Sequence, residues 1–443
     1  MHITKPFDIG HALDHGPFSR TQKTMYLLAA LAMILDGFDG QMIGFAIPAL
    51  IKEWGVTRDA FSVAVASGLF GMTIGGIFSG LLGDRIGRRI VLVTSVFVFG
   101  ACTFLIGFSN DLHTVAIIRF FAGLGIGAAL PSASALTAEY TPQRFRTVAV
   151  TTTIICYPLG GMLAGLFASQ ILPSLGWRYL FWAGGLLPAA YAVLLYFTLC
   201  ESPRYLSRKA ARWPELRRLL DRMRHPVPHD AVFIDSKEQG MVKRPGFSAL
   251  FTEGRARDTL SVCVCFFMTL LSIYSAFSWL PSMLTTEGLQ PSQASLGLTA
   301  YNLGGVVGAT ICAVAITRFG SRWPMIFFCS LAALSALLLK TIDITQHTQA
   351  FLLGLGVHGM FTNAVQCTTY ALCAHLYPTE MRVTGISAAL TVGRLGAILS
   401  SFVGAGVITA GGSAAYLNLL GFSMLVSLAA LACVKNHIPG SLK

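Results

Sequence analysis

The chain has 443 residues, of which 54% are hydrophobic and 12% charged, and its mean hydropathy is +0.65. A soluble globular protein carries about 25% charged residues, so this composition excludes an ordinary soluble domain. The formal net charge of +12 is compatible with nucleic-acid binding, but the basic residues cluster between apolar runs on one side of the expected membrane. We therefore expect no nucleic-acid partner.

Twelve apolar runs follow one another along the chain, and most are about 20 residues long, enough to cross a ~30 Å hydrocarbon layer as a helix. They are continuous and lack the ten-residue alternation of a β-barrel. We predict an all-α, multi-pass membrane protein that contacts the lipid bilayer along twelve transmembrane helices. The expected spans are 24–48, 61–82, 90–109, 113–135, 148–172, 179–199, 258–283, 294–316, 324–340, 348–375, 383–408 and 413–434.

The flanking residues predict the topology. The first run follows about 23 polar residues and is too long for a signal-peptide core, so we expect no cleavable leader. Placing both termini in the cytoplasm puts most Lys and Arg residues in cytoplasmic segments, which predicts a protein of the cell inner membrane. The ten cysteines lie almost entirely inside spans without metal-ligand spacing, so we expect no metal and no cofactor.

Residues 200–257 interrupt the apolar pattern with a basic, polar segment that is punctuated by proline. This segment predicts a cytoplasmic linker between an N-terminal six-helix bundle (1–199) and a C-terminal one (258–443). We expect the protein to act as a monomer.

The two halves also echo one another in sequence. RIGRR at 85–89 recurs as RFGSR at 318–322, and YTPQRFR at 140–146 is answered by YPTEMR at 377–382. Two echoes at nearly the same offset indicate a tandem repeat of six-helix units, an architecture found in many secondary transporters.

Three motifs in the first half carry a family resemblance. GLLGDRIGRR (80–89) resembles the loop 2–3 signature of the major facilitator superfamily, RFFAGLGIG (119–127) is similar to its fourth-helix motif, and EYTPQRFR (139–146) resembles the motif that follows. The resemblance implies the major facilitator fold and transport without an enzymatic reaction.

Within that superfamily, DGFD (36–39) is similar to the D-G-x-D motif of the aromatic acid/proton symporter family, whose members import benzoates and hydroxybenzoates. PTEMR (378–382) and GRLG (393–396) add to this resemblance. Two positions depart from the pattern: Thr317 stands where the first half has Asp84, and YPLGG (157–161) does not match the fifth-helix antiporter signature. The second departure disfavours antiport.

Asp36 and Asp39 lie in an apolar segment with no other charge from Thr24 to Ile51. A charged Asp at the bilayer centre costs about 2.5–3.5 kcal/mol on insertion scales, so acids kept there usually have a function. Residues three apart share one helix face, so the two carboxyls can act together in proton coupling or substrate binding. The alternative is a structural cap or ion pair. Glu139, in the motif after the fourth span, is the third expected proton-coupling residue.

Two arginines also fall inside spans. Arg119 lies at a depth similar to that of Asp39, so the two can form a pair, and a permanent structural bridge is the alternative. Arg394 has no acid to pair with in the second half's membrane core, and an anionic substrate could supply one through a bidentate contact. We expect Arg394 to take part in substrate binding or gating, with packing against backbone carbonyls as the alternative.

Aromatic and amide side chains in the second half suit a planar ring with polar substituents. Packing or lipid contact is the alternative for each aromatic residue, and a proton-relay role for His358 or His375 is weighed against simple hydrogen bonding. The expected substrate-binding set is Arg119, Arg394, Tyr274, Phe277, Trp279, Asn302, Asn363 and Gln366, with Tyr301 and Tyr370 nearby in sequence.

The loop motifs are expected to form a gating latch, because the resemblance implies one. Retention of positive charge on one side is the alternative for any single arginine. The expected gating residues are Gly80, Asp84, Arg85, Gly87, Arg88, Arg89, Arg318, Gly320, Arg322 and Arg382.

Together these observations predict a proton-coupled importer of a small aromatic acid that works by alternating access. Another organic anion, such as a muconate or a lactone acid, efflux, and an integral membrane enzyme are the alternatives.

Overall fold

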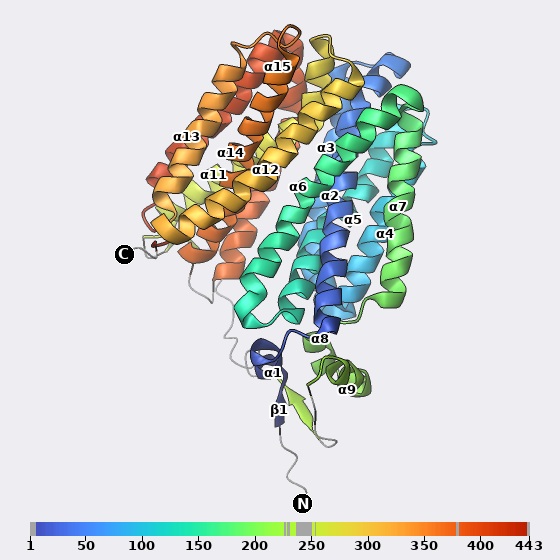
Figure 1. Cartoon of the computed structure of the whole chain (residues 1–443), viewed down its shortest axis with the longest axis vertical. Coiled ribbons are helices and arrows are strands. Elements are labelled where there is room, and N and C mark those ends of the chain that lie inside the picture. The colour runs from blue at the N-terminus through green and yellow to red at the C-terminus, as the bar shows by residue number, and fades with distance from the viewer. Residues whose placement is uncertain are drawn as a thin grey trace, which may run out of the picture.

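The structure is a computed structural model that describes residues 6–225, 227, 231–235, 250–252, 254–377 and 381–440. Long helices form two bundles that stand side by side (Figure 1). The first bundle contains α2 (Arg20–Trp54), α3 (Arg58–Ile86), α4 (Arg88–Ile106), α5 (Leu112–Tyr140), α6 (Gln143–Ser174) and α7 (Gly176–Thr198). The second contains α11 (Ala256–Thr286), α12 (Pro291–Phe319), α13 (Arg322–Leu339), α14 (Thr348–Leu376) and α15 (Arg382–Cys433). We call these bundles the N half and the C half.

The long helices account for all twelve expected spans. Ten of the described helices are long and apolar enough to cross a membrane. One of them, α15, covers two expected spans, which meet at the non-helical residues Gly411 and Gly412. The 29-residue α14 is long enough to be the remaining span but carries more polar residues.

Capping residues of the usual types mark the ends of these helices. Ser19 and Gln22 form a reciprocal capping box at the start of α2, and Thr57 and Asp111 cap α3 and α5 with their side-chain oxygens. Gly55 ends α2 in a left-handed conformation that glycine adopts without strain.

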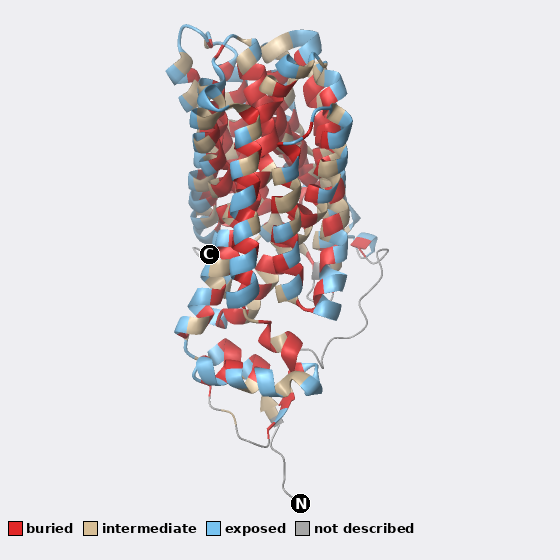
Figure 2. Ribbon diagram, turned by 90° about the vertical axis from the view of Figure 1, so that its right-hand side faces the viewer, coloured by how far each residue is buried: buried red, intermediate tan, exposed pale blue. Residues whose placement is uncertain are grey.

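The halves meet along equivalent helices. α3 packs against α15, and α12 packs against α6, while α2 contacts α11. In the six-helix repeat, α3 corresponds to α12 and α6 corresponds to the first part of α15, so the two main contacts are related by a pseudo-twofold axis. Buried residues concentrate inside the bundles, and exposed ones lie on the outside (Figure 2). Large apolar side chains such as Phe197 and Leu353 face outward, as contact with lipid requires.

Part of the predicted linker folds against the start of the chain. β1 (Pro6–Asp8) pairs in parallel with β2 (Val232–Ile234), and α1 (Ile9–His15) lies near α8 (Pro203–Ser207), η1 (Ala210–Arg212) and α9 (Trp213–Arg222). Their apolar side chains join the core of the N half: Ile9, Leu13, Leu206, Leu216 and Leu220. We call the described residues of 6–16 and 201–235 the cap, and we name the two ends of the molecule the cap end and the opposite end. The domain limits at 199 and 257 stay predictions.

Candidate functional site

The two acids of α2 are buried near the middle of the molecule. Asp36 is 1% exposed and Asp39 is 0% exposed, and their four carboxyl oxygens have no hydrogen-bond partner among the described residues. Although they are only three residues apart, they face different surroundings. Asp39 turns into the N half, and Asp36 turns toward the boundary between the halves.

The polar neighbours of Asp39 are the Thr103 hydroxyl of α4 and the Arg119 guanidinium of α5. Arg119 is itself buried, and its Nε and Nη1 atoms have no partner among the described residues. Asp39 and Arg119 are therefore neighbouring ionisable groups that interact electrostatically, as expected, but the structure records no direct ion pair between them. Gly68 of α3 makes room for the arginine, because a Cβ there would lie 3.2 Å from Arg119 Nε.

Asp36 interacts electrostatically with Arg394 of α15, which belongs to the other half. The phenols of Tyr157, from α6, and Tyr274, from α11, face one another beside the same carboxyl. An acid of one half and a cation of the other thus share one site. The sequence drew attention to both charges but not to their proximity.

Arg394 also contacts α3 directly. Its guanidinium donates a hydrogen bond to the backbone carbonyl of Met72 across the boundary between the halves. A Cβ at Gly76, one turn further along α3, would lie 2.8 Å from the guanidinium nitrogens, so glycine is needed for this approach. In this conformation Arg394 therefore packs against a backbone carbonyl, which is the alternative to substrate binding that the sequence analysis gave for it.

Aromatic rings continue the site toward the opposite end. Phe277 is the centre of the group, with ring centroids 5.7 Å from Tyr274, 6.2 Å from Tyr157 and 6.2 Å from Tyr301. Such separations are typical of favourable ring–ring contacts. Tyr157 was not expected in the site. It packs onto Gly37, where a Cβ would lie 1.9 Å from the Tyr157 carbonyl oxygen.

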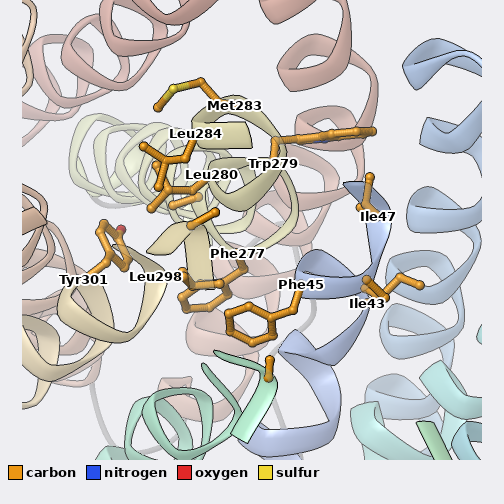
Figure 3. Packing of buried hydrophobic residues seen from close by; sticks show 14 of the residues in the cluster. Ile43, Phe45, Ile47, Phe277, Trp279, Leu280, Met283, Leu284, Leu298 and Tyr301 are labelled. Carbon is orange, nitrogen blue, oxygen red and sulfur yellow. The ribbon is translucent and has the colours of Figure 1, made fainter. Parts of the chain in front are cut away.

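Trp279 points in another direction from α11 (Figure 3). Its indole Nε1 donates to the Ser401 carbonyl of α15 at 3.1 Å, and the side chain is fully buried. Two residues advance a helix by about 200°, so Trp279 and Phe277 lie on opposite faces. Packing between α11 and α15 explains this side chain better than substrate contact.

The three expected amides have different partners. Asn302 exchanges two hydrogen bonds with Gln41 of α2, at 2.7 and 3.2 Å, and so joins the halves. Asn363 donates to the Gly359 carbonyl at 3.0 Å. Gln366 Oε1 lies 2.6 Å from the Thr269 hydroxyl, while its Nε2 has no partner among the described residues.

A second contact joins the halves at the opposite end. Arg58, at the start of α3, donates to Ser282 Oγ at 3.3 Å and to Thr286 Oγ1 at 2.7 Å, both at the end of α11. We call Gln41, Asn302, Arg58, Ser282 and Thr286 the outer seam. At the cap end of α3, by contrast, a Cβ at Gly80 would meet nothing within 4 Å. The conformation is therefore closed at the opposite end.

Glu139 lies with the loop motif and not with the α2 acids. Arg88 Nε is 2.7 Å from Glu139 Oε1, and Arg88 Nη1 is 3.0 Å from Asp84 Oδ1. Ser202 of the cap donates a hydrogen bond to Glu139, and Arg208 lies 3.6 Å from Asp84. The structure thus joins the expected gating residues Asp84 and Arg88 to Glu139 in one charged network.

The other residues of this loop are held by the cap. Gly87 has a φ of 106°, and a Cβ there would lie 2.1 Å from Glu201 Oε2, so glycine is required. Glu201 Oε1 accepts from the Arg89 backbone N–H at 3.2 Å. The Arg85 carbonyl accepts from the Tyr205 hydroxyl at 3.1 Å.

The equivalent face of the C half is built differently. Gly320 has a φ of 79° and packs against the tail at residues 434–440. Asp258 of α11 accepts from the Lys435 backbone N–H at 2.8 Å and from Asn436 Nδ2 at 2.9 Å, which fixes the tail. Two of the expected gating residues, Arg318 and Arg322, are exposed. The side chain of Arg382 and residues 378–380 lie outside the described part of the chain.

The geometry defines a two-half helical carrier with an ionisable site at the boundary between the halves. The chain matches the family model described as Major Facilitator Superfamily over residues 29–290 and 262–441, and it belongs to this family. It is a transporter and not an enzyme.

The comparisons relate it to transporters of aromatic acids. It is 34% identical to the 4-hydroxybenzoate transporter PcaK of Pseudomonas aeruginosa, over 91% of this chain and 90% of that one. It is 31% identical to the gallate transporter of Pseudomonas putida, over 98% and 96% of the two chains. The solved structure of the xylose transporter XylE from E. coli, in a partially occluded inward-open conformation, superposes with a TM-score of 0.74 at 19% identity, over 95% of this chain and 99% of XylE. The predicted all-α membrane fold with twelve helices is confirmed.

Proposed function

We propose that the protein imports an aromatic carboxylate together with protons, and that it does so in the cell inner membrane with both termini, and therefore the cap, in the cytoplasm. One observation carries the proposal: a cation of the C half, Arg394, and an acid of the N half, Asp36, face the same place beside a wall of aromatic rings. Relatives named for 4-hydroxybenzoate and gallate transport support this class of cargo.

The proposed binding step uses Arg394 as the carboxylate receptor. Its guanidinium offers parallel N–H donors that match both oxygens of a carboxylate. On substrate binding, this interaction replaces the hydrogen bond to the Met72 carbonyl and so releases α15 from α3. The aromatic ring of the substrate then lies against Phe277 and Tyr274, and ring stacking holds it there with no charged side chain involved.

The proposed coupling step links the two acids to that event. The substrate's negative charge offsets the field of Arg394 at Asp36, and proton binding to the α2 acids then accompanies substrate binding. Asp39, beside Arg119, is the acid that we expect to carry the proton, because its neighbours belong to one half and move with it. Alternating access follows when the outer seam opens and closes as the two halves rock.

Uptake by proteoliposomes under an imposed inward proton gradient tests the proposal. We expect accumulation of labelled benzoate or a hydroxybenzoate that a protonophore abolishes and that replacement of sodium by potassium leaves unchanged. Accumulation that survives the protonophore and requires sodium would contradict proton coupling. Uptake of muconate in place of every aromatic acid would favour the other class of organic anion.

A further inference from the structure

Two arginines from different segments meet at one corner of the N half, at the cap end. The Thr21 hydroxyl, in the first turn of α2, donates to the Arg222 carbonyl at the end of α9 at 3.2 Å. The Cys200 backbone N–H, just after α7, donates to Met25 Sδ of α2 at 3.2 Å. The end of α9 is thereby held against the place where α2 begins and α7 ends.

Arg89 reaches the same corner from the start of α4. Its guanidinium lies over the Tyr196 ring of α7, 5.5 Å from the ring centroid, and donates a hydrogen bond to the Tyr196 carbonyl. Arg89 and Arg222 both interact electrostatically with the Cys200 thiol, so their guanidinium groups lie close to the same atom. Burial raises the pKa of this thiol, which is therefore neutral and balances neither charge.

The positive charges of this corner are not balanced by acids. In the part of the chain that the structure describes, neither Arg89 nor Arg222 forms an ion pair. Glu215 also lies near Cys200, but its two carboxylate oxygens accept from Arg212, both at 2.9 Å. A guanidinium has several N–H donors in a fixed fork, so the corner can hold an anion that has several oxygens.

The side chains next to this corner face the membrane. Tyr196 is 59% exposed and Phe197 is 78% exposed, at the end of a helix that is long and apolar enough to span a bilayer. Ile90, directly after Arg89, is exposed as well. Tyrosine is typical of the boundary between the hydrocarbon layer and the headgroups. The two guanidinium groups therefore lie at the level of the lipid phosphates.

From this placement we infer that Arg89 and Arg222 bind the phosphate of an anionic phospholipid, whose acyl chains lie along Tyr196 and Phe197. Basic side chains at a membrane surface attract anionic headgroups, whereas a zwitterionic headgroup brings its own ammonium group to the phosphate. Because Arg89 belongs to the loop motif and Arg222 to the cap, the bound lipid joins the two. The site lies away from the boundary between the halves and does not depend on the cargo.

Native mass spectrometry of the full chain in detergent tests this inference, with phosphatidylglycerol and phosphatidylcholine of identical acyl chains as probes. We expect the wild-type protein to bind its first phosphatidylglycerol about tenfold more tightly than its first phosphatidylcholine, because each arginine near the surface adds to the attraction. Arg89→Gln combined with Arg222→Gln removes both charges and should bring this affinity ratio close to one.

A matched control separates this site from general positive charge. Arg144→Gln combined with Arg257→Gln removes two charges from exposed positions at the cap end and should leave the ratio unchanged. If the double variant at the corner does not fold, Arg222→Gln alone, at an exposed position of α9, should lower the ratio by a smaller factor.

Three results would overturn the inference: a wild-type protein without preference for phosphatidylglycerol, a corner variant that keeps the preference, and a control that loses it equally. Displacement of the bound phosphatidylglycerol by millimolar glycerol phosphate would assign the corner to soluble phosphates and would also overturn it.

Discussion

The N half and the C half have the same helical plan but carry different chemistry. In the N half, Asp36, Asp39 and Arg119 are buried ionisable side chains, and Asp84, Arg88 and Glu139 form a second ionisable group at the cap end. The buried side chains that line the C half's part of the site are aromatic or neutral polar groups around one arginine, Arg394. A repeat can thus keep its packing while its ionisable residues diverge.

The same contrast holds at the cap end. The loop of the N half is joined to the cap by the Asp84–Arg208 ion pair and by hydrogen bonds, whereas the equivalent loop of the C half is joined to the tail by two hydrogen bonds between Ser321 and Ile438. Thr317 stands at the position of Asp84, and its hydroxyl donates to the Val314 carbonyl of its own helix. From this difference we propose that proton coupling and gating depend on the N half and cargo recognition on the C half.

The largest expected effect comes from removing a proton-coupling residue of the N half. Asp39→Asn keeps shape and polarity but cannot exchange a proton, so net uptake driven by a pH gradient should fall to background while substrate exchange persists. Uptake and counterflow assays in proteoliposomes measure the two activities. Asp59→Asn, at an exposed position of α3, is the matched control. Full net uptake with an unchanged pH response would reduce Asp39 to a structural residue.

The next effect concerns the cargo side. Arg394→Lys keeps the charge but loses the planar pair of donors, so we expect the apparent KM for the carboxylate to rise about tenfold or more, equivalent to about 1.4 kcal/mol. Initial uptake rates over a range of substrate concentrations measure it. The exposed Arg20→Lys should behave as wild type. Normal transport by Arg394→Lys would exclude bidentate binding of the carboxylate by Arg394 and would show that only its positive charge is needed.

A paired substitution sharpens the comparison of the two loops. Glu139→Gln removes the carboxylate that is 2.7 Å from Arg88, and Asp258→Asn removes the one that holds the tail. A hydrogen bond to a charged group contributes about 1.5–3 kcal/mol, so both should destabilise their contacts. If gating belongs to the N half, only Glu139→Gln should slow the transport cycle several-fold. Equal slowing by both variants would show that the loops share the task.

The outer seam offers a smaller effect that involves both halves equally. Gln41→Leu leaves Asn302 buried without its partner, which costs about 1–3 kcal/mol, whereas Gln41→Leu with Asn302→Leu removes both polar groups and costs less. We expect faster labelling of a Ser282→Cys reporter by a membrane-impermeant maleimide in the single variant. The double variant should label at an intermediate rate. Identical rates in all three proteins would exclude this pair from closing the opposite end.

The smallest expected effect is a pH dependence at the cap end. Burial lowers the pKa of His225 in the cap and of His437 in the tail. A histidine whose folded-state pKa is lowered stabilises the fold when neutral, and this stability is lost as pH falls below the unfolded value of about 6.5. After correction for the intrinsic exchange rate, which itself falls with pH, the amides of residues 6–16 and 434–440 should therefore be less protected at pH 5.5 than at pH 7.5. His225→Phe should remove the dependence in the cap alone, and a dependence that survives there would assign it to other groups.

The sequence predicted the spans and the ionisable residues inside them because both can be recognised from a short segment alone. An apolar run long enough to cross a membrane indicates a span, and an ionisable residue inside such a run is rare. Other residues gave no such signal. Gln41 is uncharged, Tyr157 is one aromatic residue among many, and the cap joins segments about 200 positions apart. The direction of Trp279 was within reach of the sequence, since its spacing from Phe277 places the two on opposite helix faces.

The parallel pairing of β1 with β2 has a consequence for how the chain is made. β1 has no partner strand until Ile234 has left the ribosome, by which point all six helices of the N half have been synthesised. Arg146 and Arg204 both contact the buried carboxylate of Asp14 and so join the segment 6–16 to later parts of the chain. The cap therefore cannot be complete until all six helices of the N half have been synthesised.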